Sequence, residues 1–138
     1  ALFLHEEPLG VELGVLSPPA SLKTAAKNTT ARPSAGYKAL LDSVITTAGY
    51  PGDRAHVLSL EEECRISATA NKGHILFTTC IALKGDSGGP ILQKKDDVWN
   101  IIGLQTSATK IGGKFSGIGL SALVYQDRLT TIIDSPAP

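Results

Sequence analysis

The sequence predicts an all-β fold, an antiparallel β-barrel that is followed by a C-terminal helix. From Ala39 onward, short apolar runs alternate with turn residues at the lengths and spacings typical of barrel strands. The chain has 138 residues, of which 42% are hydrophobic and 19% charged, enough to bury one core of ordinary size. Residues 122–133 contain neither Gly nor Pro, and this stretch is long enough for a helix.

The expected elements follow in order along the chain. Residues 17–36 are rich in Pro, Ala, Lys, Ser and Thr, a composition typical of an exposed connection. The expected strands are residues 44–47, 55–60, 64–68, 74–78, 91–93, 98–105 and 115–120.

Composition argues against several classes of partner. The 13 basic and 13 acidic residues give a net charge of zero, and no basic block points to nucleic acid or an anionic membrane. No apolar run approaches the ~18 residues that span a bilayer. The two cysteines have no neighbouring histidines to complete a tetrahedral metal site, so we expect neither a metal nor another cofactor.

The most informative motif is Gly85-Asp86-Ser87-Gly88-Gly89-Pro90, a serine ringed by glycines ahead of an apolar run. Glycines let the backbone turn sharply, so that successive amide N–H groups can point at the oxygen of a substrate carbonyl. The motif therefore predicts Ser87 as a nucleophile for acyl transfer. The alternative is ordinary turn chemistry, since the same residue types dominate loops.

With this motif, three further stretches resemble the chymotrypsin-like serine endopeptidases, in particular the bacterial branch that includes the glutamyl endopeptidases. The stretches are residues 1–10, with Ala-Leu-Phe-Leu and Pro-Leu-Gly; residues 49–53, Gly-Tyr-Pro-Gly-Asp; and residues 117–121, Gly-Ile-Gly-Leu-Ser. The resemblance implies the second barrel of a two-barrel protease. Residues 1–16 would end the first barrel, 17–38 connect the barrels, 39–121 form the second barrel and 122–134 the C-terminal helix.

The resemblance also implies that part of the catalytic machinery precedes Ala1. The family orders its triad as His, Asp and Ser, which would place the histidine and aspartate in a missing N-terminal barrel. His5, His56 and His74 lack the family's sequence context, and we interpret them as structural. The chain is thus expected to be a fragment or processed form that is inactive by itself.

The resemblance also implies roles in the reaction for individual residues of the motif. Ser87 would attack the scissile carbonyl, and the N–H groups of Gly85 and Ser87 would form the oxyanion hole. Asp86 would be an orienting or structural carboxylate; in trypsin-like relatives this residue pairs with a freed N-terminus.

Substrate-binding residues follow from the same resemblance. Counting back six residues from Ser87 places Ile81 at the base of the primary pocket, where an apolar side chain would not attract Lys or Arg. Residues 101–108 resemble the pocket-wall strand that pairs with an extended substrate, with Thr106, Ser107 and Ala108 lining the pocket. Gly117 would border the opposite wall. Gln105 occupies the place of a histidine in the glutamyl endopeptidases, which weakens a Glu-specific assignment.

Cys64 and Cys80 enclose a loop of a length that a structural disulfide can close. Related bacterial enzymes also place a cysteine pair before the serine, which favours a disulfide and a secreted or periplasmic protein. Two buried thiols in a cytosolic protein are the alternative.

The sequence therefore predicts a serine endopeptidase with a polypeptide substrate. A catalytically inactive homologue acting as a binding module is the alternative. A related esterase would use the same nucleophile, but its Gly-x-Ser-x-Gly elbow leads into a helix, whereas Pro90-Ile91-Leu92 favours a strand.

Overall fold

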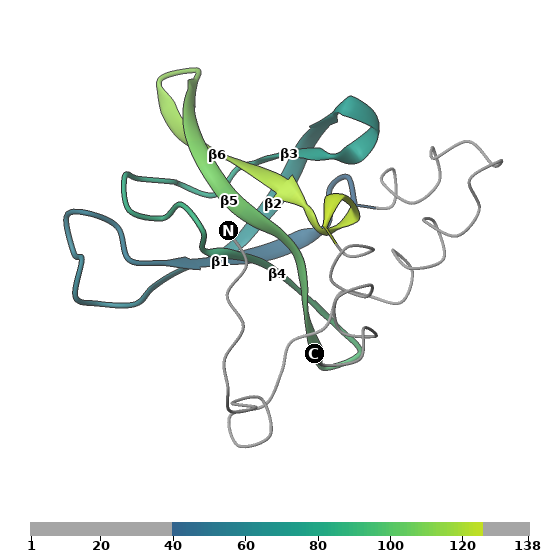
Figure 1. Cartoon of the computed structure of the whole chain (residues 1–138), viewed down its shortest axis with the longest axis horizontal. Helices are drawn as coiled ribbons and strands as arrows, with labels where there is room; N and C mark the ends of the chain where they lie inside the picture. Colours follow the sequence, from purple (N-terminus) through teal and green to yellow (C-terminus); the bar gives the residue numbers. More distant parts are fainter. Residues whose placement is uncertain (1–39, 126–138) are drawn as a thin grey trace, which may run out of the picture.

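The computed structural model describes residues 40–125 as a closed antiparallel β-barrel (Figure 1). The strands adjoin in the order β1-β2-β3-β6-β5-β4. Their bounds are β1 Val44–Gly49, β2 Ser59–Ala70, β3 Ile75–Thr78, β4 Pro90–Lys95, β5 Val98–Ile111 and β6 Lys114–Ser121. The all-β barrel prediction is confirmed. The expectations for residues 1–16 and 17–38 lie outside the described residues.

The core consists of alternate side chains that the strands direct into the barrel. Ile45, Ile66, Leu76, Ile91 and Ile102, one from each of β1 to β5, are at most 1% exposed. Because successive side chains in a strand point to opposite faces, the intervening residues face outward. Full burial of such a side chain contributes about 1.5–3 kcal/mol, so these side chains are a main source of stability.

The expected strand over residues 55–60 is wrong for residues 55–58. These residues form a turn in which the Val57 N–H donates to the Arg54 carbonyl at 2.9 Å, and Val57 and Leu58 are more than half exposed. Instead, β2 begins at Ser59 and continues through the glutamates to Ala70. A bulge opposite Thr46, with Glu63 at φ +59°, absorbs an extra residue and keeps Cys64 facing the core.

The β5–β6 hairpin extends beyond the part of β5 that is paired on both sides (Figure 1). β5 pairs with β4 only as far as Leu104, whereas its pairing with β6 continues to Ile111 opposite Lys114. Gly112 and Gly113 connect the strands with φ of +57° and +84°, values that suit a two-residue hairpin turn and that glycine adopts at little cost. β5 is therefore longer than the expected residues 98–105.

Two 3₁₀ helices are present, and both are short. η1, Asn71–Gly73, joins β2 to β3, and η2, Ala122–Val124, follows β6. The Ser121 hydroxyl caps η2 by accepting a hydrogen bond from the Leu123 N–H. The expected C-terminal helix over residues 122–134 is not confirmed, and its residues 126–134 lie outside the described range. Neither helix has the length and apolar character needed to cross a membrane.

The disulfide between Cys64 and Cys80 is confirmed, with a Cα–Cα distance of 5.0 Å. It joins β2 to the segment that follows β3, and Cys80 is fully buried. The bridge therefore anchors the beginning of the segment that carries Ser87.

Candidate active site

Ser87 lies in a loop between β3 and β4, residues 80–89, called here the Ser87 loop. Its first turn is closed by the Asp86 N–H, which donates to the Leu83 carbonyl, and by the Leu83 N–H, which donates to Asp86 Oδ2 at 2.8 Å. In the second turn the Gly89 N–H donates to the Asp86 carbonyl at 3.0 Å. Gly88 has φ +90° at the third position of this turn, where a type II turn requires a positive φ. The two turns leave Ser87 exposed at a corner of the loop.

β5 holds the Ser87 loop from one side. The Gln105 carbonyl accepts from the Gly88 N–H, and the Gln105 N–H donates to the Gly89 carbonyl, both at 2.8 Å. Thr106 is the extra residue of a bulge opposite β6. Its carbonyl accepts from Ser87 Oγ at 2.9 Å. These contacts place the Ser87 hydroxyl at the point where β5 leaves β4.

The turn at Gly49–Asp53 holds the other side of the loop. The Gly52 N–H donates to the Lys84 carbonyl at 2.6 Å. A Cβ at Gly85 would lie 2.5 Å from the Tyr50 carbonyl oxygen, and a Cβ at Gly49 would lie 2.5 Å from Asp86 Oδ1. Position 85 therefore needs glycine because two main-chain segments approach closely, whereas at Gly49 the added Cβ would meet the Asp86 carboxylate. The sequence of this turn resembles a family motif but does not indicate its contact with the Ser87 loop.

Two amide donors of the Ser87 loop remain available for a ligand. Among residues 40–125, the N–H groups of Gly85 and Ser87 donate to no acceptor, although neighbouring amides are engaged. They are separated by one residue, and both residues are exposed. Such a pair of donors is what an anionic oxygen requires for stabilisation.

A cavity of about 240 Å³ adjoins the serine and is called here the Ser87 cavity. It is lined by Ala82, Leu83, Lys84, Ser87, Gln105, Ser107 and Ala108. The structure thus brings Ser87 together with three of the predicted substrate-binding residues. Neither Gly117 nor Ile81 lines this cavity, and the Thr106 hydroxyl donates instead to the Ile118 carbonyl at 3.0 Å. The residues predicted to bind substrate did not include residues 82–84, which also line the cavity. The indication in the sequence was their position between Cys80 and Ser87.

Gly117 has a different role in the described structure. A Cβ there would lie 2.6 Å from Gln105 Nε2 and 2.7 Å from Thr78 Oγ1, so the missing side chain leaves room for the Gln105 amide. Gln105 is only 3% exposed, and its Oε1 has no hydrogen-bond partner among residues 40–125. Gln105 is therefore a buried polar group beside the cavity, and burial of such a group without a partner costs free energy.

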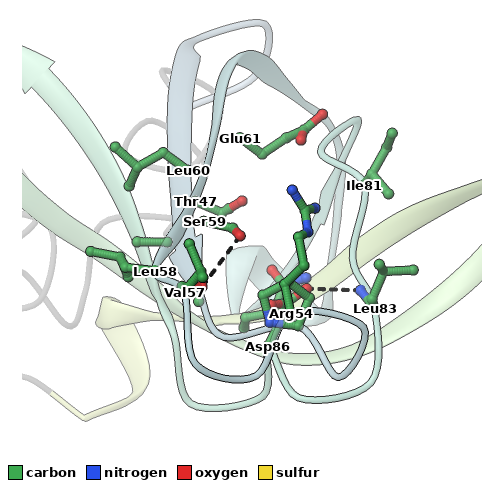
Figure 2. A pocket seen from close by; sticks show the side chains of 14 residues that line it. Thr47, Arg54, Val57, Leu58, Ser59, Leu60, Glu61, Ile81, Leu83 and Asp86 are labelled. Atoms are coloured by element: carbon green, nitrogen blue, oxygen red, sulfur yellow. Dashed lines mark hydrogen bonds between the residues drawn. The ribbon is translucent and has the colours of Figure 1, made fainter.

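A second cavity, of about 250 Å³, is lined in part by the Ser87 loop and is called here the rear cavity (Figure 2). Its lining comes from the end of β1, the following turn, the start of β2 and the Ser87 loop. Ile81, which is 53% exposed, and Asp86 line this cavity. Leu83 and Gln105 line both cavities, so they separate the space beside Ser87 from the space beside Asp86.

The described residues supply no general base to Ser87. His56 is exposed in a turn and His74 is half-buried after η1, and neither is hydrogen-bonded to the serine. His5 lies outside the described residues. Within residues 40–125 there is also no cluster of three or more His, Cys, Asp or Glu side chains that could hold a metal ion.

No protein-family model matches the chain, and no curated protein matches it.

Proposed function

We propose that the protein is a serine endopeptidase that hydrolyses peptide bonds through an acyl-enzyme on Ser87. The observation that carries this proposal is the combination at the Ser87 loop: an exposed hydroxyl, two unengaged amide N–H groups and an adjoining cavity. The six-stranded barrel and the motif resemblance to chymotrypsin-like serine endopeptidases support the same reading. The disulfide supports a secreted or periplasmic location, because such bonds persist in oxidising compartments.

In this reaction Ser87 Oγ attacks the scissile carbonyl carbon while a general base takes the hydroxyl proton. The carbonyl oxygen becomes an oxyanion and accepts hydrogen bonds from the Gly85 and Ser87 N–H groups. Loss of one such donor typically costs about 3 kcal/mol of transition-state stabilisation. The amine then leaves with the proton, and water hydrolyses the ester to regenerate the serine.

The general base comes from outside residues 40–125 in this proposal. A backbone carbonyl such as that of Thr106 accepts the hydroxyl hydrogen bond but cannot take the proton, so the observed pair leaves Ser87 unactivated. The resemblance assigns the base to a histidine, oriented by an aspartate, in the first barrel of such proteases. Without it, the 138-residue chain is expected to show negligible peptidase activity.

One observation favours the alternative of a catalytically inactive homologue that serves as a binding module. The Ser87 hydroxyl is already engaged with the Thr106 carbonyl, an interaction that a purely structural serine would also make. The two candidates differ in whether Ser87 reacts.

The test uses the protein expressed with its natural upstream sequence, and measures casein hydrolysis and labelling by a fluorophosphonate probe. Ser87→Ala is expected to abolish both signals. Ser67→Ala is the matched control, because Ser67 is also an exposed serine whose hydroxyl donates to a carbonyl across the sheet, that of Phe77 at 3.1 Å. The control should retain both signals. A protein that neither hydrolyses casein nor reacts with the probe would instead support the binding module.

A further inference from the structure

Beyond Gln105, whose main chain is hydrogen-bonded to Gly88 and Gly89 of the Ser87 loop, β5 has an edge that no other described strand covers. Pairing with β4 stops at Leu104, while pairing with β6 continues to the two-residue turn. Such a turn makes Ile111 and Lys114 a hydrogen-bonded pair, and the antiparallel alternation then directs the main-chain groups of Ala108 and Lys110 away from β6. Gly117, opposite Ala108, fits this alternation, because its N–H points away from β5 to the Cys80 carbonyl. An edge of this kind can accept an extended peptide as an added strand.

The same hairpin carries positive charge without compensation. Residues 106–117, called here the β5–β6 arm, include Lys110 and Lys114 but neither Asp nor Glu. Among residues 40–125 neither lysine forms an ion pair, whereas Lys94 on the β4–β5 hairpin is paired with Asp97 at 3.0 Å. The Lys110 ammonium lies 5.6 Å from the centroid of the Phe115 ring across the hairpin. This cation–π contact holds the Lys110 side chain against the arm.

We propose that the β5–β6 arm is a docking edge for an acidic segment of the polypeptide substrate, several residues from the scissile bond. The inference rests on the proposed function of Ser87 for the identity of the segment as substrate. The arm begins at the serine, because the Thr106 carbonyl is 2.9 Å from Ser87 Oγ. An extended strand advances about 3.3 Å per residue, which places Lys110 about 13 Å further along β5.

A substrate strand that follows β5 has the same pitch as β5. Its fourth or fifth residue from the scissile bond therefore lies beside Lys110. Lys114 lies on β6 and pairs with Ile111, so it projects from the opposite face of the arm and contributes its charge at longer range. Glu or Asp at the position beside Lys110 complements the Lys110 ammonium group, and the charge of Lys114 adds a longer-range attraction.

The docking is tested apart from catalysis with the Ser87→Ala variant of the full chain and fluorescence anisotropy. The probes are a peptide of about ten residues that alternates Glu with Thr, and the same peptide with Gln in place of Glu. The acidic peptide is expected to bind about tenfold more tightly at about 50 mM salt, and this preference should shrink at about 500 mM salt because exposed charges are screened. Lys110→Gln with Lys114→Gln should remove the preference.

The matched control is Lys94→Gln with Lys95→Gln, which removes the same net charge from the β4–β5 hairpin and should retain the preference. Equal binding of the acidic peptide and the Gln peptide would overturn the proposal. An equal loss of the acidic preference in the two double variants would also overturn it. An unchanged urea midpoint confirms that each variant is folded. If the acidic peptide docks on the arm but the unmodified serine never reacts, the docking edge stands and the endopeptidase proposal fails. If peptides are cleaved without a preference for acidic residues, the endopeptidase proposal stands and the docking-edge proposal fails.

Discussion

The replacement of Gly85 by alanine tests how tightly the Ser87 loop is packed against the turn at Gly49–Asp53. Gly85 has φ +110°, a conformation that an L-residue rarely adopts. Its added Cβ would lie 2.5 Å from the Tyr50 carbonyl oxygen and 2.9 Å from the Gly52 nitrogen. Both are main-chain atoms, so the clash can be relieved only by moving one of the two segments.

Gly88→Ala is the matched control because it shares the conformational cost without the clash. Gly88 has φ +90°, and a Cβ there meets nothing within 4 Å. We expect Gly88→Ala to lower the free energy of unfolding by about 1–2 kcal/mol through backbone strain alone. Gly85→Ala should add about 1–3 kcal/mol from overpacking. The difference between the variants isolates the contact between the Ser87 loop and the turn.

The assay is equilibrium unfolding of the full chain in urea. With an m-value of about 2 kcal/mol per M, a difference of about 2 kcal/mol separates the two midpoints by about 1 M. Equal midpoints for Gly85→Ala and Gly88→Ala would refute the claim that the close approach to Tyr50 and Gly52 constrains the loop. A change in m would mean that the variant altered the native or unfolded ensemble instead.

Three further changes test the supports of the site and the edge of the core. Replacing both Cys64 and Cys80 with alanine should cost about 3 kcal/mol, because the bridge closes a separation of 16 residues; a thermal midpoint equal to that of the oxidised protein would contradict this. Asp86→Ala should cost about 1–2 kcal/mol because the Leu83 N–H loses its acceptor, and Asp86→Asn should cost less because it keeps an oxygen; equal urea midpoints would argue against this hydrogen bond. Burial raises the pKa of the Tyr125 phenol above its usual 10.0, so its contribution to stability is complete below pH 10 and is lost as pH rises through the folded-state pKa. Tyr125→Phe should therefore flatten the alkaline fall of the urea midpoint, and an identical pH profile would contradict the assignment.

The parts of the site that sequence reasoning found are those that depend on neighbouring residues. Gly85 and Gly88 indicate a turn with positive φ, and both glycines have a positive φ in the structure. The pairing of Cys64 with Cys80 was also predictable, since these are the chain's two cysteines. In contrast, the position of Ile81 was counted along the chain, and the turn between Leu83 and Asp86 directs it to the rear cavity.

The sequence by itself determined the barrel class, the disulfide and the turn that presents Ser87, because apolar alternation and glycine content act locally. Only the tertiary structure decided what surrounds the serine. Bulges at Glu62–Glu63, opposite Thr46, and at Thr106 shift the strand register, and each shift changes which side chains face the same cavity. The contact between Gly85 and Tyr50 joins residues 35 positions apart, and it depends on the closure of the barrel rather than on either local sequence.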